Sequence, residues 1–228
     1  MPTAAEWEVL ALSLKVALWA LAVSLPAAIA VAYVLARHRF PGVTLFDAVV
    51  HLPLVLPPVV VGFALLVLFG RNGPVGRLLE PLGIVFAFRW TGAALAAAIM
   101  GFPLLVRAIR LAIESLDPRL ERAARTLGAG PWRVFFTVTL PLAVPGIVTG
   151  ALLGFARCLG EFGATITFVS NIPGETQTLP LAIYTATQVP GGDAQALRLA
   201  IFSVAISLAA LALSEWLVRR SRRASLHA

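Results

Sequence analysis

Five long runs of apolar residues, separated by shorter polar segments, restrict what this chain can fold into more than any other feature of its sequence. They cover roughly residues 9–36, 45–69, 91–113, 140–169 and 196–218. A spanning helix needs about 20 predominantly apolar residues, and only helices or closed barrels satisfy all their backbone hydrogen bonds in lipid. The runs show neither the two-residue alternation nor the length of about ten residues that barrel strands have. We therefore predict an all-α, polytopic membrane protein with five transmembrane helices.

The composition agrees with this fold class. A soluble domain carries about 25% charged residues, whereas this chain has 13% charged and 59% hydrophobic residues. No segment between the runs is long enough to fold alone, so residues 1–228 are expected to form one transmembrane domain. The net charge of +7 would suit nucleic acid, but the arginines lie beside apolar runs, where membrane topology explains them. We expect membrane lipid as a partner and no nucleic acid.

Basic residues follow the first, third and fifth runs, and this distribution predicts an orientation. If the runs are spans, the ends of the first, third and fifth runs lie on the same side of the membrane. Twelve of the eighteen lysines and arginines lie at or after these ends, namely Arg37, Arg39, Arg107, Arg110, Arg119, Arg122, Arg125, Arg133, Arg219, Arg220, Arg222 and Arg223. Because cytoplasmic loops are enriched in Lys and Arg, the N-terminus is expected outside and the C-terminus in the cytoplasm. Three arginines between residues 70 and 90 oppose this assignment. The proline cluster from Pro53 to Pro58 predicts a kink in the second run.

The polar segment 114–139, between the third and fourth runs, has the signals of a short helix. Asp117 is placed to cap a helix that begins with Pro118. Gly128 and Gly130 are expected to end it, and Pro131 prevents its continuation.

Small apolar residues recur at three- and four-residue spacing along this helix. They are Leu120, Ala123, Ala124 and Leu127. A narrow face of this kind suits a groove on a partner protein. An ordinary interfacial helix between two spans has the same pattern, so the residues alone leave both interpretations open.

A motif in this segment resembles the Glu-Ala-Ala signature of type I ABC importer permeases. It consists of Glu121-Arg122-Ala123-Ala124, then Gly128-Ala129, then Thr139-Leu140-Pro141. One departure is Arg122, which stands between the glutamate and the two alanines. The resemblance implies the fold of these permeases and a cytoplasmic loop, at roughly 114–139, that docks into a cleft on a separate ATPase. The residues expected to couple the chain to that ATPase are Glu121, Arg122, Ala123, Ala124, Leu127, Gly128 and Ala129.

A second block resembles molybdate permease subunits. It consists of Gly160-Glu161-Phe162-Gly163-Ala164-Thr165 and the string from Asn171 to Tyr184. Sulfate and thiosulfate permeases share a similar Gly-Glu-Phe-Gly block and a Thr-Leu-Pro, so they are the alternative within the class. The Asn-Ile-Pro-Gly-x-Thr-Gln-Thr-Leu-Pro string and the length of five spans favour molybdate, with tungstate as a further candidate substrate.

This resemblance implies a multi-pass subunit in a bacterial or archaeal cytoplasmic membrane. A homodimer of the subunit would form the pathway, two copies of an ABC ATPase would bind beneath it, and a periplasmic or surface-tethered binding protein would deliver the oxyanion. The chain itself is not expected to be an enzyme or to hold a cofactor or metal, because no Gly-rich phosphate loop, activated nucleophile or metal-ligand cluster is present. The rival from another class is a secondary transporter that works without an ATPase. Such transporters typically show inverted repeats, which this sequence lacks.

Three polar residues of the fourth run are candidates for a pathway or gate. An ionisable residue within a span indicates a functional site by default, and Arg157 and Glu161 lie one helical turn apart, so they share a face and can pair. The pair either locks the helix or the dimer interface, or it belongs to the outer gate. Thr165 offers a hydroxyl that suits an oxyanion or that satisfies a helix carbonyl.

Overall fold

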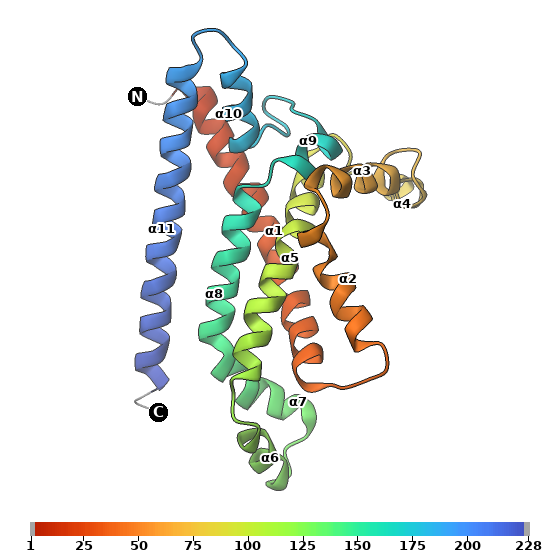
Figure 1. Ribbon diagram of the computed structural model, residues 1–228, viewed down its shortest axis with the longest axis vertical. Helices are drawn as coiled ribbons and strands as arrows, with labels where there is room; N and C mark the ends of the chain where they lie inside the picture. The colour runs from red at the N-terminus through yellow and green to blue at the C-terminus, as the bar shows by residue number, and fades with distance from the viewer. Residues whose placement is uncertain (1–2, 226–228) are drawn as a thin grey trace.

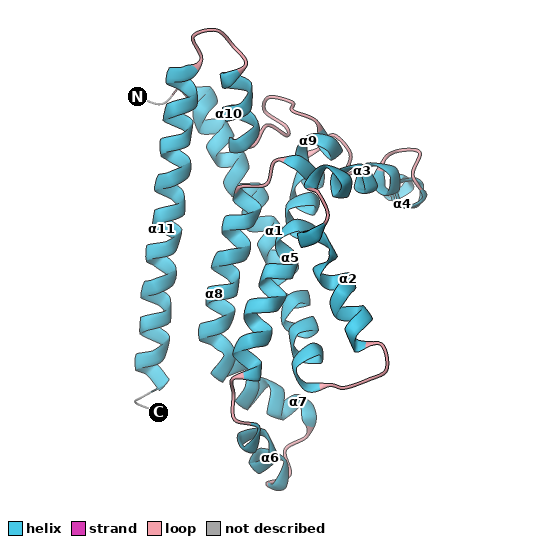
Figure 2. Cartoon of the chain, in the orientation of Figure 1, coloured by secondary structure: helices cyan, strands magenta, loops and turns pink. Residues whose placement is uncertain are grey.

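The computed structural model describes residues 3–225, and the chain is helical over most of this range (Figures 1 and 2). No strand occurs between residues 3 and 225. The α-helices are α1 (Ala4–Arg37), α2 (Val43–Val55), α3 (Pro58–Phe69), α4 (Pro74–Leu79), α5 (Trp90–Glu114), α6 (Pro118–Thr126), α7 (Pro131–Val134), α8 (Leu140–Leu159), α9 (Gly163–Val169), α10 (Leu179–Thr187) and α11 (Asp193–Ser225). A 3₁₀ turn, Glu80–Leu82, follows α4, and a π-helical stretch, Phe135–Thr139, joins α7 to α8.

Four helical stretches are long and apolar enough to cross a membrane. They are Ala4–Arg37, Trp90–Glu114, Pro131–Leu159 and Asp193–Leu213. The second apolar run divides into α2 and α3, which are bent by 110° relative to each other. The five expected spans therefore correspond to four continuous helices and one broken pair. The number of membrane crossings and the orientation of the chain stay predictions, although the two ends of the chain do lie at opposite ends of the bundle (Figure 1).

The break between α2 and α3 goes further than the kink that the proline cluster predicts. Leu56 adopts an extended conformation, with φ −71° and ψ 141°, as a residue that precedes a proline prefers. Pro57 has no backbone N–H to continue the hydrogen bonds of α2, and Pro58 takes the first position of α3, where a proline is favoured. As a result α3 is directed sideways from the bundle, beside α9 and far from α6 and α7 (Figure 1).

The fourth apolar run is also interrupted. Helix α8 ends at Leu159, and α9 begins at Gly163 after a short turn. Helix α9 packs mainly on α3. The two are so close that a Cβ atom added at Gly62 would stand 2.5 Å from the carbonyl oxygen of Ala164. Two halves of separate apolar runs therefore cover the same end of the bundle.

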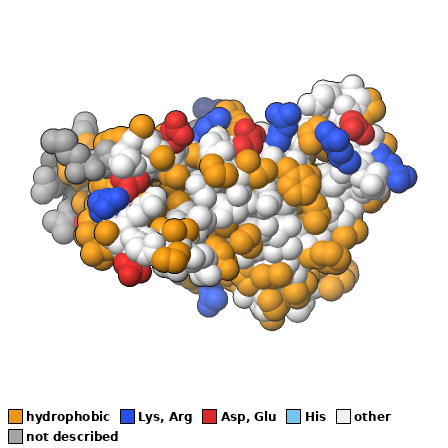
Figure 3. Space-filling view, turned by 90° about the horizontal axis from the view of Figure 1, so that it is seen from above, with side chains coloured by type: hydrophobic (Ala, Val, Ile, Leu, Met, Phe, Trp, Pro, Cys, Tyr) orange, Lys and Arg blue, Asp and Glu red, His pale blue; other side chains and the backbone are white. Residues whose placement is uncertain are grey.

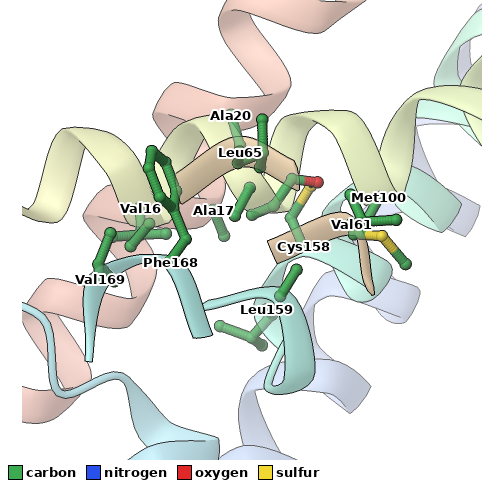
Figure 4. Packing of buried hydrophobic residues seen from close by; sticks show 14 of the residues in the cluster. Val16, Ala17, Ala20, Val61, Leu65, Met100, Cys158, Leu159, Phe168 and Val169 are labelled. Carbon is green, nitrogen blue, oxygen red and sulfur yellow. The ribbon is translucent and has the colours of Figure 1, made fainter. Parts of the chain in front are cut away.

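The centre of the bundle consists of α1, α5 and α8, which contribute to two core clusters, and a smaller third cluster joins α1 to α10 and α11. The cluster nearer α9 brings together Val16, Met100, Cys158 and Phe168 from four helices (Figure 4). Helix α11 stands beside α8 and α10 and leaves most of its apolar side chains exposed (Figure 1). Seen from above, hydrophobic side chains occupy much of the surface and charged ones are scattered (Figure 3). Such a surface suits contact with lipid or with a further subunit.

Glycines let α8 approach α5 closely. Gly146, Gly150 and Gly154 recur every four residues on α8, and Cβ atoms added there would meet atoms of Ala112, Ile109 and Leu105 on α5. Small residues at this spacing let two membrane helices pack with their backbones near each other. The repeat is visible in the sequence as a glycine at every fourth position from 146 to 154.

Candidate functional site

The loop from residue 115 to 139, named here the α5–α8 loop, projects from one end of the bundle (Figure 1). Its first helix, α6, forms where the sequence predicts it. The Asp117 side chain accepts a hydrogen bond from the N–H of Arg119 at 2.9 Å, and Pro118 is the first helical residue. Gly128 follows the helix with φ +83°, a left-handed conformation that favours glycine. Pro131 then opens α7.

The outward surface of this loop carries large apolar side chains among exposed arginines. The exposed fractions are 48% for Leu120, 89% for Leu127, 77% for Trp132 and 58% for Phe136. Ala123 is exposed as well, and Ala124 is half-buried. Large apolar side chains so fully exposed at the tip of a protein indicate a surface that a partner covers. Of the other residues expected to couple, Arg122 and Gly128 are exposed and Ala129 is half-buried.

Glu121 differs from the rest of the expected coupling set, because it points into the chain. Its side chain is only 7% exposed. The Nε of Arg37, at the end of α1, donates to its Oε1 atom at 3.0 Å. The hydroxyl of Thr139 donates to the same oxygen, also at 3.0 Å, and is itself buried. Glu121 therefore ties α6 to the last residue of α1 and to the start of α8.

An aromatic contact supports the same junction. The ring of Tyr33, one turn before Arg37 on α1, meets the ring of Phe135 edge-on, with centroids 4.9 Å apart. No sequence pattern reveals this junction, because Arg37 and Glu121 are 84 residues apart and the position of Arg37 after an apolar run indicates topology alone.

The second group of candidate residues lies at the opposite end of the bundle. Arg157 and Glu161 form the expected ion pair, and Glu161 is 2% exposed. The Oε1 atom of Glu161 also accepts a hydrogen bond from the N–H of Ala164 at 2.8 Å, which caps the first turn of α9. These contacts fit the interpretation of a pair that locks the helix, and its role in transport stays a prediction.

Thr165 follows Glu161 by four residues in the sequence, and it does not reach the surface. Its side chain is 1% exposed. The neighbouring hydroxyl of Thr167 donates to the carbonyl oxygen of Gly163 at 2.9 Å, so this hydroxyl satisfies a helix carbonyl. The structure therefore keeps the candidate residues in two groups, one at each end of the bundle. No group of three metal-ligating side chains occurs in the part of the chain that the structure describes.

Comparison with known proteins identifies relatives along almost the whole chain. Residues 24–223 match the family described as "Binding-protein-dependent transport system inner membrane component". The molybdenum transport system permease protein ModB of Escherichia coli K12 is 62% identical over 218 residues, which are 95% of each chain. ModB of Haemophilus influenzae is 57% identical over 219 residues, 96% of each chain. A probable sulfate transport system permease protein of Chlorokybus atmophyticus is 40% identical over 154 residues, 68% of this chain and 54% of that protein.

Solved structures of ABC importers have the same fold. A bacterial transporter that imports alginate superposes with a TM-score of 0.76 at 19% identity, over 96% of this chain and 80% of that one. The MetNI methionine transporter gives a TM-score of 0.68 at 16% identity, over 95% of this chain and 94% of that one. At such identities the likeness concerns the fold alone. The family match and the ModB relatives together establish that this chain belongs to the inner membrane components of binding-protein-dependent transport systems, the ABC importer permeases, and is a multi-pass transport subunit of the inner membrane instead of an enzyme.

Proposed function

We propose that this chain is the membrane subunit of an ATP-driven importer of molybdate, with tungstate as a second substrate. The observation that carries the proposal is the 62% identity to a molybdenum transport permease over 95% of both chains. The 40% identity to a probable sulfate permease covers a smaller part of both proteins. Sulfate import is therefore the second candidate, and it is the one that the experiment must separate from molybdate import.

The α5–α8 loop is the proposed contact with the ATPase. Leu127 and Trp132 stand out from its surface, and burial of apolar area is the main favourable term in most associations of proteins. The small side chain of Ala123 lets a groove on the ATPase come close to the α6 backbone. When ATP draws two ATPase copies together, the two loops move with them and the pathway opens outward. Hydrolysis and release then return it to the inward-open arrangement.

A second copy of this chain is the proposed partner within the membrane. Helices α2 and α3 carry exposed apolar side chains along much of their length, such as Leu45 at 70%, Val55 at 82% and Phe63 at 60%. Two copies facing each other through these helices would enclose a pathway that neither copy encloses alone. A binding protein on the outside would deliver the oxyanion to this pathway.

The deciding experiment is uptake of labelled molybdate into proteoliposomes that contain the chain with its ATPase. The binding protein and substrate are supplied outside and ATP inside. We expect uptake that requires ATP and persists in excess sulfate. Uptake without the ATPase would indicate a secondary transporter, and strong competition by sulfate would assign the chain to sulfate import.

A further inference from the structure

We propose that Arg37, the last residue of α1, is a positioning residue that holds the α5–α8 loop against the membrane-spanning bundle. Glu121 is its partner in this brace and does not contact the ATPase. The inference rests on the proposed function, because it describes the route by which movement of the loop reaches the transmembrane helices.

The loop needs a brace because it can bend at two places. Residues 115–117 connect α5 to α6, and residues 127–130 separate α6 from α7. The second connection contains Gly128 in a left-handed conformation and Gly130, and glycine permits more backbone conformations than any other residue. A short helix between two flexible connections transmits a displacement to the bundle only if a contact fixes the helix itself. Glu121 is the one residue of α6 that is buried, and it is where the helix is held.

The chemistry of the contact suits a brace that withstands movement. Arg37 uses its Nε atom to bond one oxygen of Glu121, while its Nη2 atom is buried without a hydrogen-bond partner among the described residues. Because a guanidinium presents its donors as a planar fork, a small tilt of α6 would let Nη2 bond the second carboxylate oxygen while the first bond is kept. Loss of Arg37 leaves the buried carboxylate of Glu121 with the hydroxyl of Thr139 and with Arg125, whose Nη2 atom lies 3.9 Å from Oε2. Loss of Glu121 leaves the guanidinium of Arg37 in a largely buried place.

From Arg37 the path leads into the core of the bundle. Tyr33 packs on Phe135 one turn earlier along α1. Helix α1 therefore contacts the first half of the loop through Arg37 and Glu121 and the second half through Tyr33 and Phe135. Helix α1 packs along α5 and α8 for much of its length. Movement of the loop therefore reaches α1 directly, in addition to the two helices to which the loop is covalently joined.

The experiment compares Arg37→Gln, Glu121→Gln, the double variant and the charge swap Arg37→Glu with Glu121→Arg. The control is Arg39→Gln, which removes an exposed arginine two residues away. For each complex three quantities are measured: the amount of chain in the membrane, the ATPase that co-purifies, and the molybdate transported per ATP hydrolysed. The last quantity reports on coupling and would not change if the pair only stabilised the fold.

We expect both single variants to retain the ATPase and to lower the transport ratio by about tenfold, a size typical of coupled charge pairs. The double variant should be no worse than either single one, and the swap should recover most of the ratio. If the single variants fail to accumulate, the swap decides, because it restores both accumulation and the ratio only if the two residues pair. Release of the ATPase by Glu121→Gln but not by Arg37→Gln would overturn the proposal, since Glu121 would then contact the ATPase. Failure of the swap would overturn it as well. Absence of uptake by the unaltered complex would count against the proposed function instead.

Discussion

Replacement of Gly146 by alanine should destabilise the protein, because the single added Cβ atom would clash with α5. The added Cβ would stand 2.0 Å from the Cβ of Ala112 on α5, whereas two carbon atoms pack at about 3.5–4.0 Å. The methyl group of Ala112 has no torsion that moves it away, so α5 and α8 would have to separate by roughly 1.5 Å at this point. Overpacking of this kind costs about 1–3 kcal/mol. A separation of 2.0 Å places this site in the upper part of that range, above the gain of about 1 kcal/mol that alanine brings to a helix interior.

The other glycines of α8 form a graded series. A Cβ at Gly154 would lie 2.7 Å from Leu105, and one at Gly150 would lie 3.2 Å from Ile109. At Gly160, the residue that follows the end of α8, the nearest atom is 3.5 Å away, an ordinary contact. We expect Gly146→Ala to be the most damaging, Gly154→Ala to be intermediate, Gly150→Ala to be near neutral, and Gly160→Ala to serve as the matched control.

The assay is denaturant-induced unfolding of the purified subunit in detergent, followed through the tryptophan fluorescence. Gly146→Ala should lower the free energy of unfolding by about 1–2 kcal/mol relative to Gly160→Ala. Combining it with Ala112→Gly moves the methyl group from one helix to the other and should recover part of the loss. Equal stability of the Gly146 and Gly160 variants, or no recovery in the double variant, would refute the inferred close packing of α5 and α8.

Three further outcomes follow from single contacts. Arg157→Ala should harm accumulation of the protein and hence transport more than Glu161→Gln, because it leaves a carboxylate that is 2% exposed without its countercharge; equal accumulation and equal transport by the two variants would contradict this. Leu127→Asp should abolish co-purification of the ATPase without lowering the stability of the subunit, since the side chain is 89% exposed; retained ATPase would remove α6 from the contact. Ser13→Ala should cost about 1–3 kcal/mol in unfolding experiments, because the Ser13 hydroxyl accepts the buried N–H of Leu179 at 2.7 Å; an unchanged midpoint would show that this N–H finds another partner.

Local signals in the sequence predicted local structure well. The length and composition of the apolar runs predicted the all-helical membrane fold, and the Asp117-Pro118 pair and Gly128 predicted the limits of α6. The Arg157–Glu161 ion pair was predicted because its two members are one helical turn apart. Each of these features depends on residues that are close neighbours along the chain.

Local sequence patterns do not predict contacts between residues that are far apart along the chain. The proline cluster from Pro53 to Pro58 predicts a kink, but the observed break of 110° leaves α3 packed on α9, a contact that no local pattern reveals. The face of α6 that turns inward is selected by Arg37 and Thr139, which belong to other elements. The motif places Glu121 among the residues expected to couple the chain to an ATPase, and it does not reveal that the side chain is buried. A charged residue in a docking motif is therefore not by itself evidence of exposure.

The pairing of α3 with α9 has a consequence for biosynthesis. When the ribosome has made residues 58–69, the segment 163–169 on which they finally rest does not yet exist. Helix α3 must therefore enter the bilayer without its final packing partner. It can pack on α9 only after more than half of the remaining polypeptide has been inserted. Truncation before Gly163 should thus leave α2 and α3 sensitive to membrane proteases, even though every residue of both helices is present.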